Sequence, residues 1–173
     1  EIATATLNQL VRLNNLHAMA ACLVKLETGM LSEDRYADFN MPSMKPVCKS
    51  MNKASRELLA ANNVLRDFAP RIEERFRKSL YDEILVEISD DYGNTIRNVS
   101  AKPFDLVVQL ATLAQSIHNT PLDKVKGHDA DVYFINKNRR DNLLVSSEKG
   151  LQIVTEDTHA KIENLNQMAE GIV

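Results

Sequence analysis

Apolar residues recur at three- and four-residue steps along most of this chain, the spacing of one face of an α-helix. The first such stretch runs from residue 2 to about 28, and its apolar residues cover more than one stripe, so we expect a helix packed on two sides. A second helix is predicted from Met44 towards Ala69, with Ser43 as its N-cap. Its stripe is the clearest in the chain and comprises Val47, Met51, Ala54, Leu58, Ala61, Leu65 and Phe68.

Pro70 should break or kink this second helix, because proline lacks a backbone donor and disfavours helical geometry at the preceding residue. A third helix follows, with apolar residues at four-residue spacing: Ile72, Phe76, Leu80 and Ile84.

The stretch from 84 to 99 has two interpretations. Ile84, Val86 and Ile88 alternate as in a strand, and residues 91–94 have turn chemistry, so a hairpin over 84–99 is one alternative. The four-residue spacing that reaches Ile84 favours the other, a helix that continues to about Ile88.

The C-terminal part of the pattern changes character. Pro103 suits the first turn of a helix that ends near Asn119, before Pro121. Three short β-branched or aromatic runs then predict a strand meander, at 132–135, 143–145 and 151–154. Thr155 is expected to cap a last helix, whose apolar face contains Ile162, Leu165, Met168, Ala169 and Ile172.

Together these elements predict a mainly α protein (α+β): a helical bundle of about four to five helices with a small antiparallel β meander near the C-terminus. A chain of 173 residues has the length of one domain, so we expect a single domain over 1–173. Its helical part would occupy about 1–120, and the meander plus terminal helix about 130–173.

Composition narrows the function classes. The chain has no Trp, only 5% aromatic residues and a net charge of −3, which argues against a nucleic-acid partner. No apolar run is long enough for a membrane span, so we expect a soluble chain, with the cytoplasm favoured. Basic residues dominate 45–78 and only acidic ones occur over 81–91, a pattern that favours intramolecular or head-to-tail pairing. Cys22 and Cys48 are expected as reduced, buried thiols.

Candidate chemistry is sparse. His118, Asp123, His128, Asp129 and Asp131 form the densest polar group, and His118, His128, Asp129 and Asp131 are the metal-ligand candidates, although their spacing matches no metal motif. A solvent-exposed connection has the same composition. Glu83 and Glu87 would share one face of a helix, but no nucleophile or phosphate-loop motif accompanies them, so no cofactor is implied.

By elimination, the sequence favours a non-enzymatic subunit that binds a protein partner or itself. The broad apolar faces carry that interpretation, and Leu58, Leu65, Ile162 and Leu165 are its candidate interaction residues. One alternative is a ligand-sensing helical domain of a receptor, in which Asn14, Asn15 and His17 face a pocket for a small molecule. A second alternative is a metal-dependent enzyme that uses the 118–131 loop.

Overall fold

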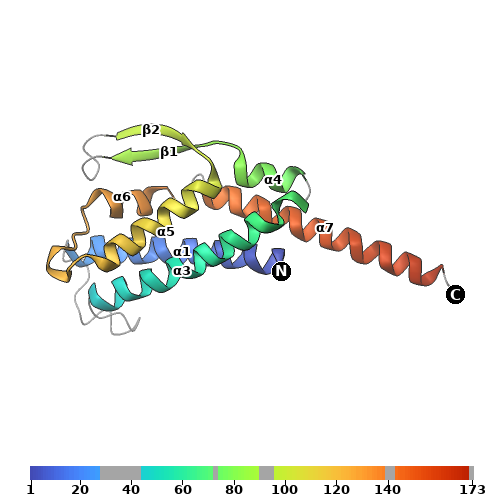
Figure 1. Cartoon of the computed structure of the whole chain (residues 1–173), viewed down its shortest axis with the longest axis horizontal. Coiled ribbons are helices and arrows are strands. Elements are labelled where there is room, and N and C mark those ends of the chain that lie inside the picture. Colours follow the sequence, from blue (N-terminus) through green and yellow to red (C-terminus); the bar gives the residue numbers. More distant parts are fainter. Residues whose placement is uncertain (28–43, 72–73, 90–95, 139–142, 172–173) are drawn as a thin grey trace.

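A computed structural model describes residues 1–27, 44–71, 74–89, 96–138 and 143–171 (Figure 1). Long helices form the body, a two-stranded sheet lies on one side of them, and the last helix runs far out of the body. In chain order the elements are α1 (Ile2–Glu27), α3 (Met44–Phe68), η2 (Ala69–Arg71), α4 (Glu74–Tyr81), β1 (Ile84–Ser89), β2 (Ile96–Ala101), α5 (Pro103–Asn119), η3 (Leu122–Lys124), α6 (Ala130–Lys137) and α7 (Leu144–Glu170).

Helices α1, α3 and α5 form the centre of the body. The predicted stripe of α3 is buried except for the half-buried Phe68, and α3 packs against α1 and α5. Because α1 contacts α3, α6 and α7, it buries more than one face, as its broad apolar surface predicts. The large, fully buried side chains of this core include Leu13, Leu16, Leu23, Met51, Leu58, Leu106 and Leu110.

Polar side chains tie the three central helices together. The Gln9 amide donates to Asn62 Oδ1 at 3.1 Å, and Asn62 Nδ2 donates to the carbonyl oxygen of Phe104 at 3.5 Å. Gln9 and Asn62 are buried, so these bonds satisfy groups that would otherwise be costly to remove from water. Nearer the surface, Arg12 pairs with Glu57 across α1 and α3 at 2.5 Å.

The breaks between helices follow the expected proline chemistry. At Pro70 the chain leaves α3 and forms a short 3₁₀ turn, Ala69–Arg71. Pro103 occupies the first turn of α5, where a backbone N–H would have no partner within the helix, so its absence breaks no hydrogen bond. The predicted end of α3 and both predicted ends of α5 are confirmed to within one residue. The predicted Ser43 cap lies outside the described residues.

The hairpin alternative is correct, and the helix favoured as far as Ile88 is wrong. Helix α4 stops at Tyr81, and β1 pairs antiparallel with β2, with Ile84 opposite Ala101 and Ser89 opposite Ile96. The alternating pattern of apolar residues correctly indicates a strand here, because Val86 packs into the core while its neighbours Leu85 and Glu87 lie on the opposite face of β1. The predicted turn at 91–94 is outside the described residues.

The predicted meander near the C-terminus is in the wrong place. Residues 132–135 lie in helix α6, and 144–145 and 151–154 lie in helix α7. All four residues of the first run are buried, because α6 is enclosed by α1, α5 and β1, so its apolar residues show no helical alternation. Thr155 does not cap a helix: it lies inside α7, where its hydroxyl donates to the carbonyl oxygen of Leu151 at 2.8 Å.

The class of fold is nevertheless as predicted: mainly helical, with one small antiparallel sheet in the described part of the chain. The number of helices in the described residues is slightly higher than expected, because the first of the three predicted strand regions forms a helix of its own, α6, while the other two belong to α7. No helix among the described residues is long and apolar enough to cross a membrane. Cys48 is buried and Cys22 is half-buried, and both are free thiols.

Candidate functional site

A cleft of about 770 Å³ opens between α4, the hairpin, the end of α6 and the first turns of α7. Four cationic side chains and two carboxylates line it, together with apolar groups from β1 and α7. The lining residues are Arg75, Lys78, Ser79, Asp82, Ile84, Leu85, Glu87, Asn98, Lys137, Asn138, Ser146, Lys149 and Ile153.

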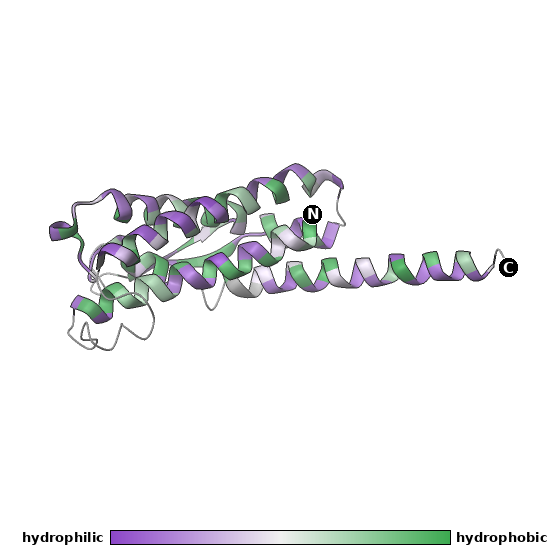
Figure 2. Cartoon of the chain, turned by 90° about the horizontal axis from the view of Figure 1, so that it is seen from below, coloured by the Kyte–Doolittle hydropathy of each residue, from purple (hydrophilic) through white to green (hydrophobic). Residues whose placement is uncertain are grey.

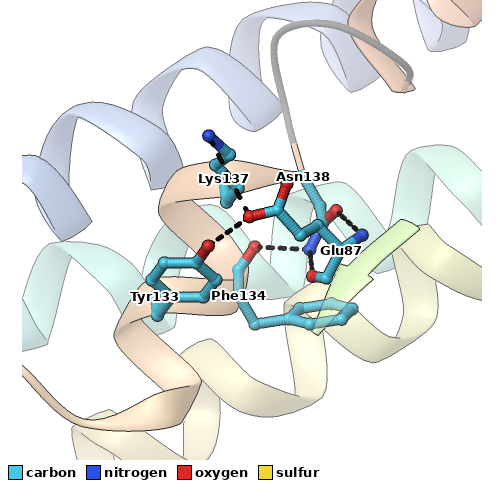
Figure 3. A network of polar contacts seen from close by, with 5 residues as sticks. All are labelled: Glu87, Tyr133, Phe134, Lys137 and Asn138. Atoms are coloured by element: carbon cyan, nitrogen blue, oxygen red, sulfur yellow. Dashed lines mark hydrogen bonds and ion pairs between the residues drawn. The ribbon is translucent and has the colours of Figure 1, made fainter. Parts of the chain in front are cut away.

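The side-chain amide of Asn138 forms part of one wall of this cleft, and it bonds to the backbone of β1 as a neighbouring strand would (Figure 3). The backbone N–H of Glu87 donates to Asn138 Oδ1 at 2.7 Å, and Asn138 Nδ2 donates to the carbonyl oxygen of Glu87 at 2.6 Å. Asn138 Nδ2 also donates to the carbonyl oxygen of Phe134, at 3.2 Å. Because Asn138 is buried at the end of α6, this amide joins the outer edge of β1 to that helix.

The side chain of Glu87 is held from the same helix. Tyr133 donates its hydroxyl proton to Glu87 Oε1, and Lys137 Nζ lies 4.0 Å from the same oxygen (Figure 3). Glu83, the other carboxylate of the predicted helical pair, precedes β1 instead and does not line the cleft. These contacts, with a phenol and an ammonium group, tie the side chain of Glu87 in the hairpin to α6.

The cations of the cleft are partly engaged by carboxylates of their own helices or of α7. Lys78 lies 3.5 Å from Glu74, and Arg75 lies 3.7 Å from Glu156 at the point where α7 leaves the body. The side chains of Arg75 and Lys78 are exposed, so each pair contributes little to stability. Cations outnumber carboxylates among the lining residues, but Glu74 and Glu156 offset two of these cations from outside the lining.

The metal-ligand candidates point in different directions. His118 Nδ1 lies 3.1 Å from the carbonyl oxygen of Cys48, so it joins α5 to α3. His128 Nδ1 lies 2.7 Å from Glu27 Oε1, and its backbone N–H donates to Glu27 Oε2 at 2.8 Å. Among the described residues, no three metal-ligating side chains come together.

These contacts give the 118–131 loop a packing role. A Cβ on Gly127 would lie 2.6 Å from the carbonyl oxygen of Leu23, so only glycine allows the loop this close to α1. Asp129 and Asp131 are at the start of α6, where burial, and then the charge of Asp129, raise the pKa of the Asp131 carboxyl. Burial likewise raises the pKa of the Cys48 thiol, which disfavours a nucleophilic thiolate there.

The residues proposed for ligand sensing are half-buried on α1. Asn14 donates to the carbonyl oxygen of Leu10, one turn earlier in its own helix, at 3.1 Å. None of Asn14, Asn15 and His17 lines the 770 Å³ cleft, so this cleft is a different place from the predicted pocket.

Of the four candidate interaction residues, two are inside the body and two are on the surface. Leu58 and Leu65 are fully buried in the packing of this chain itself, so they are not available to a partner of the folded protein. Ile162 and Leu165 are 50% and 65% exposed on α7, and Met168 is 66% exposed one turn further on. A periodic apolar stripe alone cannot distinguish these cases, because a covered and an uncovered helix face have the same spacing.

Helix α7 has two unlike halves. In its first part, which we call the packed half (residues 144–154), Gly150 and Val154 are buried against α4 and α1. In its second part, which we call the projecting half (residues 155–170), every residue is exposed. Figures 1 and 2 show this half extending beyond the body, with hydrophobic bands recurring along it.

No family model, curated protein or solved structure matches this chain. Its function is therefore inferred from the cleft and the projecting half alone.

Proposed function

We propose that this protein is a non-enzymatic interaction subunit that presents the projecting half of α7 to a protein partner. The observation that carries the proposal is the exposure of Ile162, Leu165 and Met168 on a helix that leaves the body. An isolated helix of about 16 residues is marginal in water, so helical packing against a partner would stabilise it. Amphipathic helices of this kind bind proteins through residues spaced at three and four positions.

The arrangement of the projecting half supports a protein partner. Polar residues cover the rest of the surface of this half, and its acidic residues outnumber its single lysine, Lys161. An anionic polar face is repelled by nucleic acid and by anionic lipid surfaces, whereas the apolar stripe fits a complementary helix or groove.

The test is photo-crosslinking in the source cells, with a photoreactive amino acid at position 165 or, as the matched control, at position 163. Leu165 lies on the apolar stripe, and Glu163 lies on the polar side of the same turns. We expect one discrete crosslinked protein from position 165 and none from position 163. Equal crosslinking from both positions, or none from either, would contradict the proposal.

A second candidate function, binding of a small anionic ligand, is favoured by the lysines that line the cleft. Lys149 and Lys137 face the same space as the apolar Ile153, a combination that suits a carboxylate or phosphate with an apolar part. Isothermal titration with citrate and with inorganic phosphate would test it. Lys149→Ala should weaken binding, whereas the control Lys53→Ala, on the surface of α3, should not. If neither citrate nor phosphate produces heat of binding, the cleft does not bind these two anions.

A further inference from the structure

A row of basic side chains follows the outer side of α3. Its members recur at steps of four, four and three residues, so they share one side of the helix over about 16 Å. All of them are exposed, and the buried apolar stripe of α3 lies on the opposite side of the helix. We call these residues the basic row: Lys45, Lys49, Lys53 and Arg56.

The basic row has no carboxylate partner in the described part of the chain. None of its cations forms an ion pair with a described residue. Cations elsewhere do form such pairs: Arg66, further along α3, lies 3.2 Å from Asp67, and Lys161 lies 2.6 Å from Asp157. Contacts among the described residues therefore do not neutralise the positive charge of the row.

The two helices that pack against α3 add little negative charge beside the row. Helix α1 has no acidic residue between Glu1 and Glu27, and α5 has none after Asp105. Glu57, the acidic residue that follows the row in the sequence, is held by Arg12 of α1 at 2.5 Å. The potential of the row is not cancelled by these neighbours, and it extends about 10 Å into solvent at about 0.1 M salt.

Charges of opposite sign are separated along the molecule. Figure 1 shows α3 beginning at the end of the body opposite to the projecting half of α7. The projecting half is acidic, because its one lysine is outnumbered by Glu156, Asp157, Glu163 and Glu170. The net charge of −3, which in the sequence argues against nucleic acid, is therefore a sum over unlike surfaces. The local field at α3 depends on the basic row instead.

The composition of this face favours phosphate groups over a protein or a lipid surface. None of the described residues of α3 is an exposed large apolar side chain, and on the adjoining α5 only Val108 is, at 38%. A protein interface has an apolar core from which lysine is depleted, and a helix that lies in a bilayer surface inserts an apolar side. The exposed side of α5 instead offers uncharged hydrogen-bonding groups: Gln109, Thr112, Ser116 and Asn119.

We propose that the basic row binds the phosphate backbone of a nucleic-acid duplex. Lysine, arginine and uncharged amide and hydroxyl side chains are the groups that contact nucleic-acid phosphates. Each DNA strand carries one charge per about 3.4 Å of helix axis, so the row spans about five phosphates of one strand. The aromatic residue of α3, Phe68, is half-buried and lies beyond the row, so the face has no platform on which single-stranded bases would stack.

This binding does not rest on the proposed function. The basic row is on α3, whereas the protein partner is proposed for the projecting half of α7, at the other end of the body (Figure 1). Crosslinking at position 165 and duplex binding at the row therefore succeed or fail independently.

Salt dependence is the expected signature of this contact. Phosphate contacts release counterions, so four of them predict a slope of about −3.6 for log K against log salt concentration. Binding should then weaken about 150-fold between about 50 and 200 mM salt. At about 50 mM salt we expect a Kd in the range of about 1–100 µM, the same for unrelated sequences.

The first experiment is fluorescence anisotropy of the full chain with labelled duplexes of about 20 base pairs, one of DNA and one of RNA. The double variant Lys49→Ala/Lys53→Ala should weaken binding by about tenfold or more at about 50 mM salt, and should halve the salt slope. The control Arg66→Ala/Lys102→Ala removes the same charge outside the row, and we expect a change of less than about threefold. All four residues are exposed, so neither variant should affect folding.

The outcomes of this titration are distinct. Binding of either duplex with the expected slope and variant effects supports the proposal, and the tighter duplex identifies the polymer. Absence of binding to both duplexes at about 500 µM protein, or equal effects of the two double variants, overturns it.

The second experiment tests the class of anion by competition for the labelled duplex. Unlabelled duplex of a different sequence should displace it fully, whereas polyglutamate and phosphatidylserine vesicles at the same concentration of anionic groups should displace less. If polyglutamate competes better than duplex, the row recognises an acidic protein, and if the vesicles do, it recognises a membrane surface. Either result overturns the proposal.

Discussion

The two halves of α7 belong to one helix and have opposite environments. Val154, in the packed half, is 8% exposed, whereas Leu165, about three turns later on the same side of the helix, is 65% exposed. The local sequence does not distinguish the two halves, because both are amphipathic and helical. The difference teaches that the extent of α1 and α4 decides where the buried part of α7 ends, and that the rest of this side of the helix is exposed.

The largest expected effect comes from removing the aromatic ring that the packed half covers. Phe76 is fully buried, so Phe76→Ala should lower the free energy of unfolding by about 3–5 kcal/mol. Met168→Ala, in the projecting half, should change it by less than about 0.5 kcal/mol in the monomer. Urea denaturation at low protein concentration measures both. Similar losses would mean that the projecting half is packed in solution.

A charge moved along one side of α7 tests the boundary between the halves. Val154→Asp places a carboxylate in the cluster with Ala5 and Phe76, and we expect the free energy of unfolding to fall by about 3 kcal/mol. Thr158 lies about one turn further along the same side and is exposed, so Thr158→Asp should cost less than about 0.5 kcal/mol. Thermal unfolding of the two variants locates the boundary. A large loss from Thr158→Asp would place it further along α7.

Glycine substitutions sharpen the comparison. A Cβ on the buried Gly150 would lie within 3.3 Å of both Phe76 Cε2 and Ser79 Oγ, so Gly150→Leu should overpack this contact and cost about 1–3 kcal/mol. Gly171 follows α7 in a helical conformation, and a Cβ there would lie 3.4 Å from its nearest neighbour, an atom of its own helix. Gly171→Ala should therefore change stability by less than about 0.5 kcal/mol. Differential scanning calorimetry distinguishes the two, and a neutral Gly150→Leu would show that α4 and α7 separate easily.

The smallest effect is a pH dependence confined to the body. Burial and the neighbouring Asp129 raise the pKa of Asp131 above its ordinary value of 3.8. The folded chain therefore binds more protons than the unfolded chain in the window above 3.8, and stability falls as the pH rises through it. Asp131→Asn should remove that fall, so its advantage over the wild type should appear as the pH increases and then level off. Unfolding curves between about pH 3 and pH 8 cover this window. An advantage that grows toward low pH would contradict the assignment.

Sequence patterns predicted some elements of this fold well and others poorly. The α3 stripe and the breaks at Pro70 and Pro103 are correct because one buried face and missing backbone donors act locally. The strand predicted at 132–135 is wrong because four consecutive apolar residues carry no helical period. Glycine is typical of a turn between strands, yet Gly150 lies in the middle of α7. The ring of Phe76 packs against it there and leaves little space for a side chain.

The candidate site was only partly accessible from sequence. The spacing of Ile162 and Leu165 predicts that they bind a partner; the structure exposes both side chains, and their role stays a prediction. The cleft was not found, because its walls come from elements that are distant in the chain. The sequence contains one hint of the cleft, because Glu87 and Asn138 are polar residues beside apolar runs. Nothing in either run, however, indicates that the two residues contact each other.

What the sequence by itself determined is the helical character of the chain, the break at Pro70, the helix start at Pro103 and an amphipathic C-terminal helix, because helical period and missing backbone donors act within a few residues. Only the tertiary structure decided which apolar faces are covered. Leu58 and Leu165 have equivalent local patterns, yet Leu58 is enclosed by neighbouring helices and Leu165 extends past them. Burial depends on where other segments end, and that information is distributed over the whole chain.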